Sequence, residues 1–259
     1  SKRKHDKADA QTLATLLRID KLPTVWVPPV DLRRWRGLIE HRHYLVRCRA
    51  RAKNGLRSLL RMHAIEAPRS LWTRPGMAWL SGASMPDAIE ALRRDHLLTD
   101  VERYQQMIER VEKVLNTLAA EHPAVTLLQT IPGIGPRTAE AFVAYVGDPH
   151  RFSRTRDVGA YFGLIPCQDD SAGQKRLGHI TKEGPATARW LLVEATWHVI
   201  RRSSSMRERL ERVSHGKRQR RKIAVVAVAR HLTRVMLAML KTGTCWQEEL
   251  PAQEPARAA

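Results

Sequence analysis

The chain has 259 residues, of which 43% are hydrophobic, so it can build a folded core and is not disordered as a whole. Lysine and arginine number 45 against 26 acidic residues, which gives a formal net charge of +19. This excess excludes an ordinary soluble enzyme and predicts a polyanionic partner, because basic side chains set against phosphates release condensed counterions. A merely solubilising surface is the alternative, but the charge is concentrated in particular arginine-rich stretches.

The cysteines and the N-terminal residues restrict the class further. Cys48, Cys167 and Cys245 lie far apart without CxxC spacing, which argues against a zinc site or a disulfide framework and fits a reducing cytosol. The first ten residues lack the apolar core of a signal peptide, and the sequence has no run of eighteen apolar residues. We therefore expect a cytoplasmic, nucleoid-associated bacterial protein with no membrane partner. Because the chain begins with Ser1, we also expect it to be the C-terminal part of a longer protein.

A first helix is predicted from Asp6 to about Ile19, because Leu13, Leu16 and Leu17 have the spacing of an amphipathic helix. Asp6 and Asp9 lie three residues apart at its start, hence on one face, where they could reach a shared divalent cation. Taken alone, such paired acids are more typical of helix capping and dipole interactions.

A second, strongly basic helix is predicted from Asp31, a plausible N-cap, to about Ala67. Its apolar stripe includes Trp35 and Leu45, and its cations are candidates for contacts to a nucleic-acid backbone. The candidate residues are Arg42, Arg49 and Lys53.

A loop rich in Trp, Pro and Gly is expected next, and then a helix from about Pro86 to Glu121. Apolar residues alternate there by three and four, as in the seam of a coiled coil, at Val101, Tyr104, Ile108, Val111, Leu115 and Leu118. The two long helices predict either a hairpin packed within one chain or a dimerising arm, since both seams look alike in sequence.

The clearest local motif is the sequence IPGIGPRTA from Ile131 to Ala139, which predicts a helix-hairpin-helix. Gly133 and Gly135 permit a tight turn, and the following helix offers free N–H groups to a phosphate, with Arg137 beside them. An ordinary Gly-rich turn between helices is the alternative.

A Gly-rich stretch from Gly159 to Gly184 reads as a flexible loop that carries Ser171 among cations. Such cations would stabilise the phosphorane formed if the serine hydroxyl attacked a phosphodiester. The candidate cations are Lys175, Arg176, His179, Lys182 and Arg189. Spacing alone would favour a simple turn residue. Helices are predicted farther on, near Pro185 to Arg201 and from Arg221 to Lys241.

Three motifs occur together in the order found in one family: DxxDA at the start of a helix, IPGIGPRTA, and GLIP…DSAG…RLGHITKEG…AR. Together they resemble the IS116/IS110/IS902 transposases of insertion sequences. These have a RuvC-like acidic DEDD domain and a C-terminal serine domain, and are also described as bridge-RNA-guided recombinases. The resemblance covers almost the whole chain and is most specific from Gly163 to Arg189.

The resemblance implies a mainly α protein in four parts. These are the end of a RuvC-like α/β domain (1–28), a basic coiled-coil arm (29–123), a C-terminal transposase domain with the helix-hairpin-helix and serine loop (124–245) and a disordered tail (246–259).

The resemblance also implies catalytic roles and partners. Ser171 matches the serine that joins covalently to cleaved DNA, and Asp6 and Asp9 match the third and fourth acids of a Mg²⁺ site. The first two acids are expected upstream of Ser1, so this chain alone could be an inactive nucleic-acid-binding protein. Asp170 and Ala172 depart from the family's usual Ser and Gly. Implied partners are DNA, a guide RNA and further copies of the chain, as a dimer or tetramer.

Overall fold

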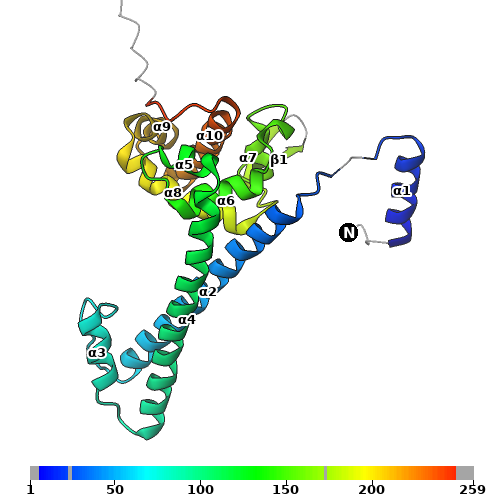
Figure 1. The fold of residues 1–259 in the computed structure, drawn as a ribbon. Coiled ribbons are helices and arrows are strands. Elements are labelled where there is room, and N and C mark those ends of the chain that lie inside the picture. Colours follow the sequence, from blue (N-terminus) through cyan, green and yellow to red (C-terminus); the bar gives the residue numbers. More distant parts are fainter. Residues whose placement is uncertain (1–5, 23–24, 172–173, 249–259) are drawn as a thin grey trace, which may run out of the picture. The chain divides into compact units, whose positions relative to one another are not determined.

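The computed structural model describes residues 6–22, 25–171 and 174–248, without the side chains of 168–177. Its described residues are mainly helical, as predicted (Figure 1). Contacts divide the chain into two compact units, one ending at Val30 and the other beginning at Asp31. Each unit is described by itself.

The first unit contains helix α1 (Asp6–Arg18), close to the predicted bounds. No residue of α1 is buried, and the apolar side chains of Leu13 and Leu17 are 56% and 66% exposed. An amphipathic helix gains most of its stability from packing its apolar face. The described residues of this unit supply no such packing for α1.

The arm contains helices α2 (Val30–Met62), α3 (Arg74–Gly82) and α4 (Ala88–Ala120). Helices α2 and α4 run antiparallel within one chain, because Arg42 near the start of α2 bonds Glu112 near the end of α4. Farther along, Arg49 bonds Gln105. The arm has its own apolar cluster, made by Ala52, Leu56, Leu60, Leu71, Leu80 and Val101. Of the two predicted arrangements, the hairpin within one chain is the one seen here, and pairing with a second chain stays a prediction.

Helix α3 corrects the expectation of a loop in this region. Thr73 caps the helix by accepting a hydrogen bond from the backbone N–H of Gly76 at 3.4 Å, and a proline lies in the first turn. A β-carbon on Gly76 would overlap the carbonyl oxygen of Ser70, so the chain approaches its own backbone closely here. The composition of this segment suggested a loop, but the Thr73 cap, the proline in the first turn and the close packing at Gly76 together stabilise a helix.

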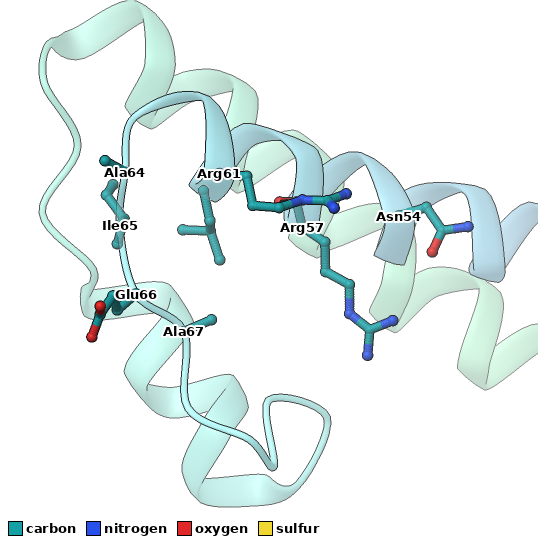
Figure 2. Close-up of a pocket in the computed structure, with 8 residues that line it drawn as sticks. Asn54, Arg57, Arg61, Ala64, Ile65, Glu66 and Ala67 are labelled. Carbon is teal, nitrogen blue, oxygen red and sulfur yellow. Dashed lines mark hydrogen bonds between the residues drawn. The ribbon is translucent and has the colours of Figure 1, made fainter.

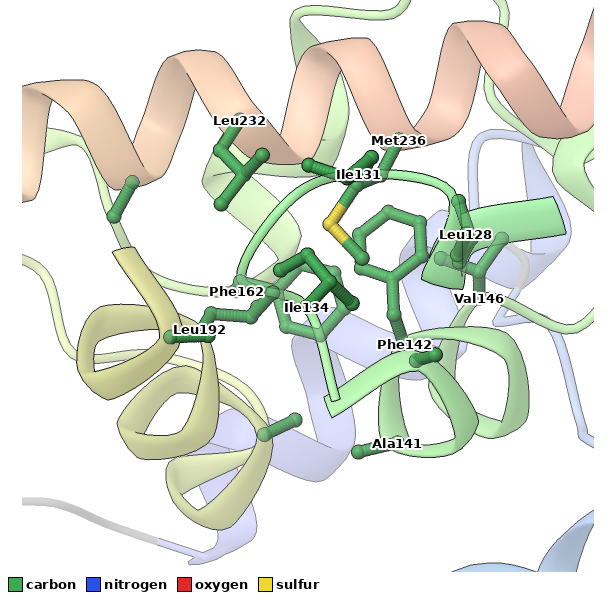
Figure 3. Close-up of a cluster of buried hydrophobic side chains, with 14 of the residues drawn as sticks. Leu128, Ile131, Ile134, Ala141, Phe142, Val146, Phe162, Leu192, Leu232 and Met236 are labelled. Carbon is green, nitrogen blue, oxygen red and sulfur yellow. The ribbon is translucent and has the colours of Figure 1, made fainter. Parts of the chain in front are cut away.

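The remaining helices and strands form a C-terminal domain. They are α5 (Pro123–Gln129), α6 (Pro136–Val146), α7 (Asp157–Tyr161), β1 (Pro166–Ser171), β2 (Gln174–Ile180), α8 (Ala186–Arg202), α9 (Ser204–Ser214) and α10 (Arg221–Thr242). Phe142 and Phe162 stack with ring centroids 5.4 Å apart, and Leu192, Leu232 and Met236 surround them from α8 and α10 (Figure 3).

Helix α10 is the central helix of this core. By length and composition it is apolar enough to cross a membrane, but half of its most apolar window is buried inside the protein. The buried residues Val228, Leu232 and Met236 are fully covered. We therefore describe α10 as a core helix.

The first turns of α2 are fixed to the C-terminal domain. The Arg36 guanidinium donates to the backbone carbonyls of Ala144 at 2.8 Å and Tyr145 at 2.9 Å. The Glu40 carboxylate accepts from the hydroxyls of Tyr145 and, at 2.5 Å, Thr187. These bonds join α2, α6 and α8, so the arm and the C-terminal domain meet at a defined junction.

The start of the predicted disordered tail also contacts this domain. The Trp246 backbone N–H donates to the Thr130 hydroxyl at 3.0 Å, and the Glu248 carboxylate accepts from the Ser203 hydroxyl at 2.8 Å. Residues 249–259 of the predicted tail lie outside the described part of the chain.

Candidate active site and nucleic-acid interface

Ser171 is the last residue of β1, which pairs antiparallel with β2. The register sets Ser171 opposite Gln174, so the serine lies at the tip of a β-hairpin. In the same register Asp170 pairs with Lys175 and Asp169 with Arg176. The expected flexible loop is therefore a paired hairpin over its described residues. The predicted gathering of Lys175 and Arg176 around the Ser171 hydroxyl concerns side chains outside the described part of the structure.

Two glycines hold the base of this hairpin closed. Gly163 has φ +63°, and a β-carbon on it would overlap the carbonyl oxygen of Glu183. Gly184 has φ +71°, and a β-carbon there would overlap the carbonyl oxygen of Tyr161. Only glycine combines this backbone conformation with such close approach. We call these contacts, together with Arg189, the hairpin clasp.

Arg189 completes the clasp from the first turns of α8. One of its guanidinium nitrogens donates to the carbonyl of Phe162 at 3.1 Å and to that of Glu183 at 2.7 Å. Burial lowers the pKa of this guanidinium. The residue predicted to contact nucleic acid therefore has a role within the protein, joining both ends of the hairpin. Lys182, by contrast, is exposed.

The predicted helix-hairpin-helix segment joins α5 to α6. Gly133 has φ +101°, and a β-carbon on it would lie 2.7 Å from the backbone of His198, so this glycine lets the turn pack on α8. Gly135 is the N-cap of α6, and a β-carbon there would meet no atom within 4 Å. Of the two glycines, Gly135 is the one whose surroundings leave room for a phosphate at the helix N-terminus.

Arg137, the second residue of α6, has partners within the protein. It bonds the Asn116 side chain on α4, and its guanidinium lies 3.2 Å from the carboxylate of Glu140. Glu140 is only 1% exposed. Burial raises its pKa to about 7, although the nearby guanidiniums of Arg137 and Arg42 act in the opposite direction. Arg137 therefore belongs to a buried charge group between α4 and α6.

The predicted cations of α2 also turn toward partners within the arm. Arg42 donates to the Glu112 carboxylate at 2.7 Å, and Arg49 bonds the side-chain oxygen of Gln105. The Lys53 ammonium lies 4.7 Å from the centre of the Trp72 ring, and burial, with the nearby charges of Arg49 and Arg57, lowers its pKa.

Sequence reasoning did not separate these inward cations from the outward ones. Arg47, Arg51, Arg57 and Arg61 are exposed, and within the described residues none of them has a carboxylate at ion-pair distance. We call these four residues the outer stripe of the arm. The outer stripe could have been identified from the sequence, because its residues lie on the side of the helix away from the apolar residues Leu45, Ala52 and Leu56, which are buried.

At the tip of the arm, the outer stripe borders a hollow of about 770 Å³ between the end of α2 and the following loop. Figure 2 shows Arg57 and Arg61 on its α2 side and Glu66 on the loop. Arg57 also lies over the Trp72 ring, 5.3 Å from its centre. Basic and aromatic side chains together suit a nucleic-acid strand, whose phosphates and bases they contact.

Asp6 and Asp9 lie in the first turn of α1, and both are exposed. Within the described residues, no group of three or more His, Cys, Asp or Glu side chains could hold a metal ion. The pair offers hard oxygen ligands of the kind Mg²⁺ takes, but it does not make a metal site by itself.

Comparison with known proteins matches two segments of the chain. Residues 125–211, which include the α5–α6 turn and the serine hairpin, match the model of the transposase IS116/IS110/IS902 family. Residues 1–65, which include Asp6, Asp9 and all of α2, match a second model, described as a transposase, for the DEDD domain of IS110-type elements.

Curated relatives extend this similarity over most of the chain. A probable family 20 transposase of Pseudomonas aeruginosa is 29% identical over 252 residues, covering 94% of this chain and 74% of the relative. The transposase for insertion sequence element IS1328 of Yersinia enterocolitica is 28% identical, covering 95% and 74%. The transposase for IS1111A of Coxiella burnetii is 27% identical, covering 76% and 55%. The chain thus spans about half to three quarters of the length of these relatives.

Proposed function

Because this chain carries segments that match both transposase domains of the IS116/IS110/IS902 family, we propose that it cuts and rejoins DNA at an insertion sequence, with Ser171 as the nucleophile. The position of Ser171 carries this proposal. The serine ends β1 at the tip of a hairpin whose base is closed by Gly163, Gly184 and Arg189. A base closed in this way fixes the backbone of the strand that carries the nucleophile.

In the proposed first step, the Ser171 oxygen attacks a phosphodiester, and the bond between phosphorus and the 3′ oxygen breaks. The 3′ oxygen takes up the proton that the serine loses, and the 5′ end stays on the protein as a phosphoserine. In the second step, the 3′ hydroxyl of another strand attacks that phosphoserine and releases the serine. Each step replaces one phosphate ester by another, so no nucleoside triphosphate is needed.

Asp6 and Asp9 would supply two ligands for a Mg²⁺ ion, which would stabilise the leaving oxygen. Because the described residues add no third ligand, neither step above runs through this ion. A guide RNA and a dimer or tetramer remain proposals that rest on the family resemblance. The outer stripe of the arm, with its four exposed arginines, is a better candidate for a nucleic-acid backbone than Arg42, Arg49 and Lys53.

A second candidate function is nucleic-acid binding without catalysis. The incomplete carboxylate set favours it, and the net charge of +19 serves either function. The two functions differ in one observable, a covalent bond between protein and DNA.

The test incubates the protein with end-labelled element DNA, its flanking RNA and Mg²⁺, and looks for a denaturation-resistant adduct. A parallel incubation adds a purified RuvC-like acidic domain, which would supply further carboxylates. We expect an adduct that disappears in Ser171→Ala while DNA binding stays. Ser58→Ala, which changes an exposed serine of α2, is the control and should keep the adduct. An adduct that persists in Ser171→Ala excludes this nucleophile, and DNA binding without adducts in either incubation supports the second candidate.

A further inference from the structure

A dense positive patch lies between α9 and α10, outside the segment that matches the family model. Residues 217–222 read Lys-Arg-Gln-Arg-Arg-Lys, which is five cations in six residues with no acid. All six residues are exposed. We call this segment the basic turn. The proposed cleavage steps do not use it.

The backbone of the basic turn is well fixed. Helix α9 ends at Ser214 and is capped by His215 in the left-handed conformation, and the Lys217 N–H then donates to the Ser214 carbonyl at 3.0 Å. The Arg220 N–H donates to the Lys217 carbonyl, also at 3.0 Å. Helix α10 begins at the next residue, Arg221. The Arg221 guanidinium lies 5.6 Å from the centre of the Trp197 ring on α8. The cations therefore project from a defined surface of the core.

Within the described residues, no carboxylate lies at ion-pair distance from any of these five cations. Three exposed arginines elsewhere are balanced, because Arg34, Arg93 and Arg103 each pair with an acid three residues before them, whereas among the described residues the outer stripe of the arm is uncompensated like the basic turn. The turn also begins the 22-residue helix α10, whose first N–H groups have no side-chain cap. Uncompensated cations and the positive end of a helix dipole together favour a polyanion.

We propose that the basic turn binds the phosphodiester backbone of a nucleic-acid duplex. Its placement supports this ligand. Helix α10 contacts the region preceding the hairpin where Arg230 packs on Gly159, at 3.1 Å from a β-carbon built there. From Arg221 to Arg230 the helix rises about 14 Å. That is less than half of the roughly 34 Å turn of B-DNA, so a duplex bound at the basic turn is long enough to extend past Gly159, which precedes the hairpin. A duplex shared with the hairpin rests on the proposed function, whereas backbone binding by the turn does not.

The test compares two triple variants in a Ser171→Ala background, so that adduct formation does not distort the equilibrium. The first is Lys217→Gln with Arg218→Gln and Arg220→Gln, which leaves Arg221 on Trp197. The control is Arg34→Gln with Arg93→Gln and Arg103→Gln, which removes the same charge from balanced positions. All six positions are exposed, so both proteins should fold, and thermal unfolding checks this.

The measurement is Kd for DNA and RNA duplexes of roughly 20 base pairs between about 50 and 200 mM salt. We expect the basic-turn variant to weaken binding at least about tenfold and to lower the slope of log K against log salt by about 2 to 3. The control should change Kd less than about threefold. A loss confined to one duplex identifies the nucleic acid that the turn binds. Equal losses in both variants, or no change in slope, would overturn the inference. Loss of the Ser171 adduct has no bearing on this slope, so the two proposals can fail separately.

Discussion

The basic residues of the arm and those at the base of the hairpin are held differently. On α2 the cations fall into two layers. Arg42, Arg49 and Lys53 have partners within the arm and are partly buried, whereas the outer stripe is exposed and has no carboxylate at ion-pair distance among the described residues, although its Arg57 also lies over the Trp72 ring. At the hairpin, Arg189 bonds two backbone carbonyls of its own domain and leaves the exposed Lys182 as the outward cation.

This difference teaches that position in the fold, and not residue type, separates cations that stabilise the protein from those available to a ligand. An inward cation should affect unfolding when it is removed, because a buried partner loses its hydrogen bond. An outward cation should affect affinity and its dependence on salt, with little effect on stability. Each prediction below tests one side of this separation.

The largest effect is expected at the hairpin clasp, which depends on backbone contacts. Gly184→Ala adds a β-carbon against the Tyr161 carbonyl at φ +71°, and should lower the free energy of unfolding by about 3 kcal/mol. Gly243→Ala is the matched control, because φ is +70° there but no atom lies within 4 Å. It should cost only about 1 kcal/mol. Urea unfolding measures both, and equal losses would show that the close contact at Gly184 does not matter.

The junction between arm and C-terminal domain should make stability depend on pH. Burial raises the pKa of Glu140 from 4.5 to about 7. Below the unfolded value, both folded and unfolded chains hold the proton. Between about pH 4.5 and 7 the unfolded chain has lost this proton while the folded chain still holds it, so the folded state loses stability as pH rises, by about 3 kcal/mol in all.

The comparison protein for this prediction is Glu140→Gln, which keeps the shape but cannot ionise. The difference in unfolding free energy between the two proteins should change between about pH 5 and 8, whereas histidines contribute equally to both. A difference that is constant over this range would show that Glu140 is ionised throughout in the folded state.

The two layers of α2 should separate stability from binding. Arg42→Ala leaves the Glu112 carboxylate without its partner and should cost about 1.5 kcal/mol of stability. Arg47→Ala, one layer outward, should cost less than about 0.5 kcal/mol. Arg47→Ala should instead reduce the slope of log K for DNA against log salt by about 0.9, the value expected for one lost phosphate contact. Chemical unfolding and DNA titration on both proteins decide this, and the reverse pattern would refute the assignment of layers.

The long helices could be predicted from sequence because their apolar periodicity extends over many turns. Helix α1 and the two arm helices were found this way, with ends a few residues from those observed. Helix α3 was missed although its signals were present, since Thr73 and the following proline are typical of a helix start. The Trp-, Pro- and Gly-rich composition of the segment led us to expect a loop in spite of these helix-start signals.

The hairpin could not be predicted, because what closes it is tertiary. Its strands lack a clear alternation of apolar residues, and the pairing depends on Gly163 approaching Glu183 across twenty residues of sequence. Arg189 illustrates the same limit: its charge suggested a phosphate contact, and only the folded backbone shows the two carbonyls that it bonds. The positions of Ser171, Asp6 and Asp9 came from a family resemblance and not from spacing.

Among the cations with partners inside the protein, Arg189 gives the smallest expected loss of stability, and it tests the comparison most directly. Arg189→Ala removes the donor to Phe162 and Glu183, so the unfolding free energy should fall by about 1 kcal/mol and adduct formation should slow, while Kd for DNA and its salt dependence stay unchanged. Arg189→Lys keeps the charge without the planar guanidinium that bridges the carbonyls. If Arg189 held a phosphate, the lysine variant would retain its affinity for DNA. The alanine variant would bind more weakly, and its slope of log K against log salt would be smaller by about 0.9. If Arg189 instead positions the hairpin, both variants should bind DNA normally and form adducts slowly. Neither alanine nor lysine can bond the carbonyls of Phe162 and Glu183 as the guanidinium does.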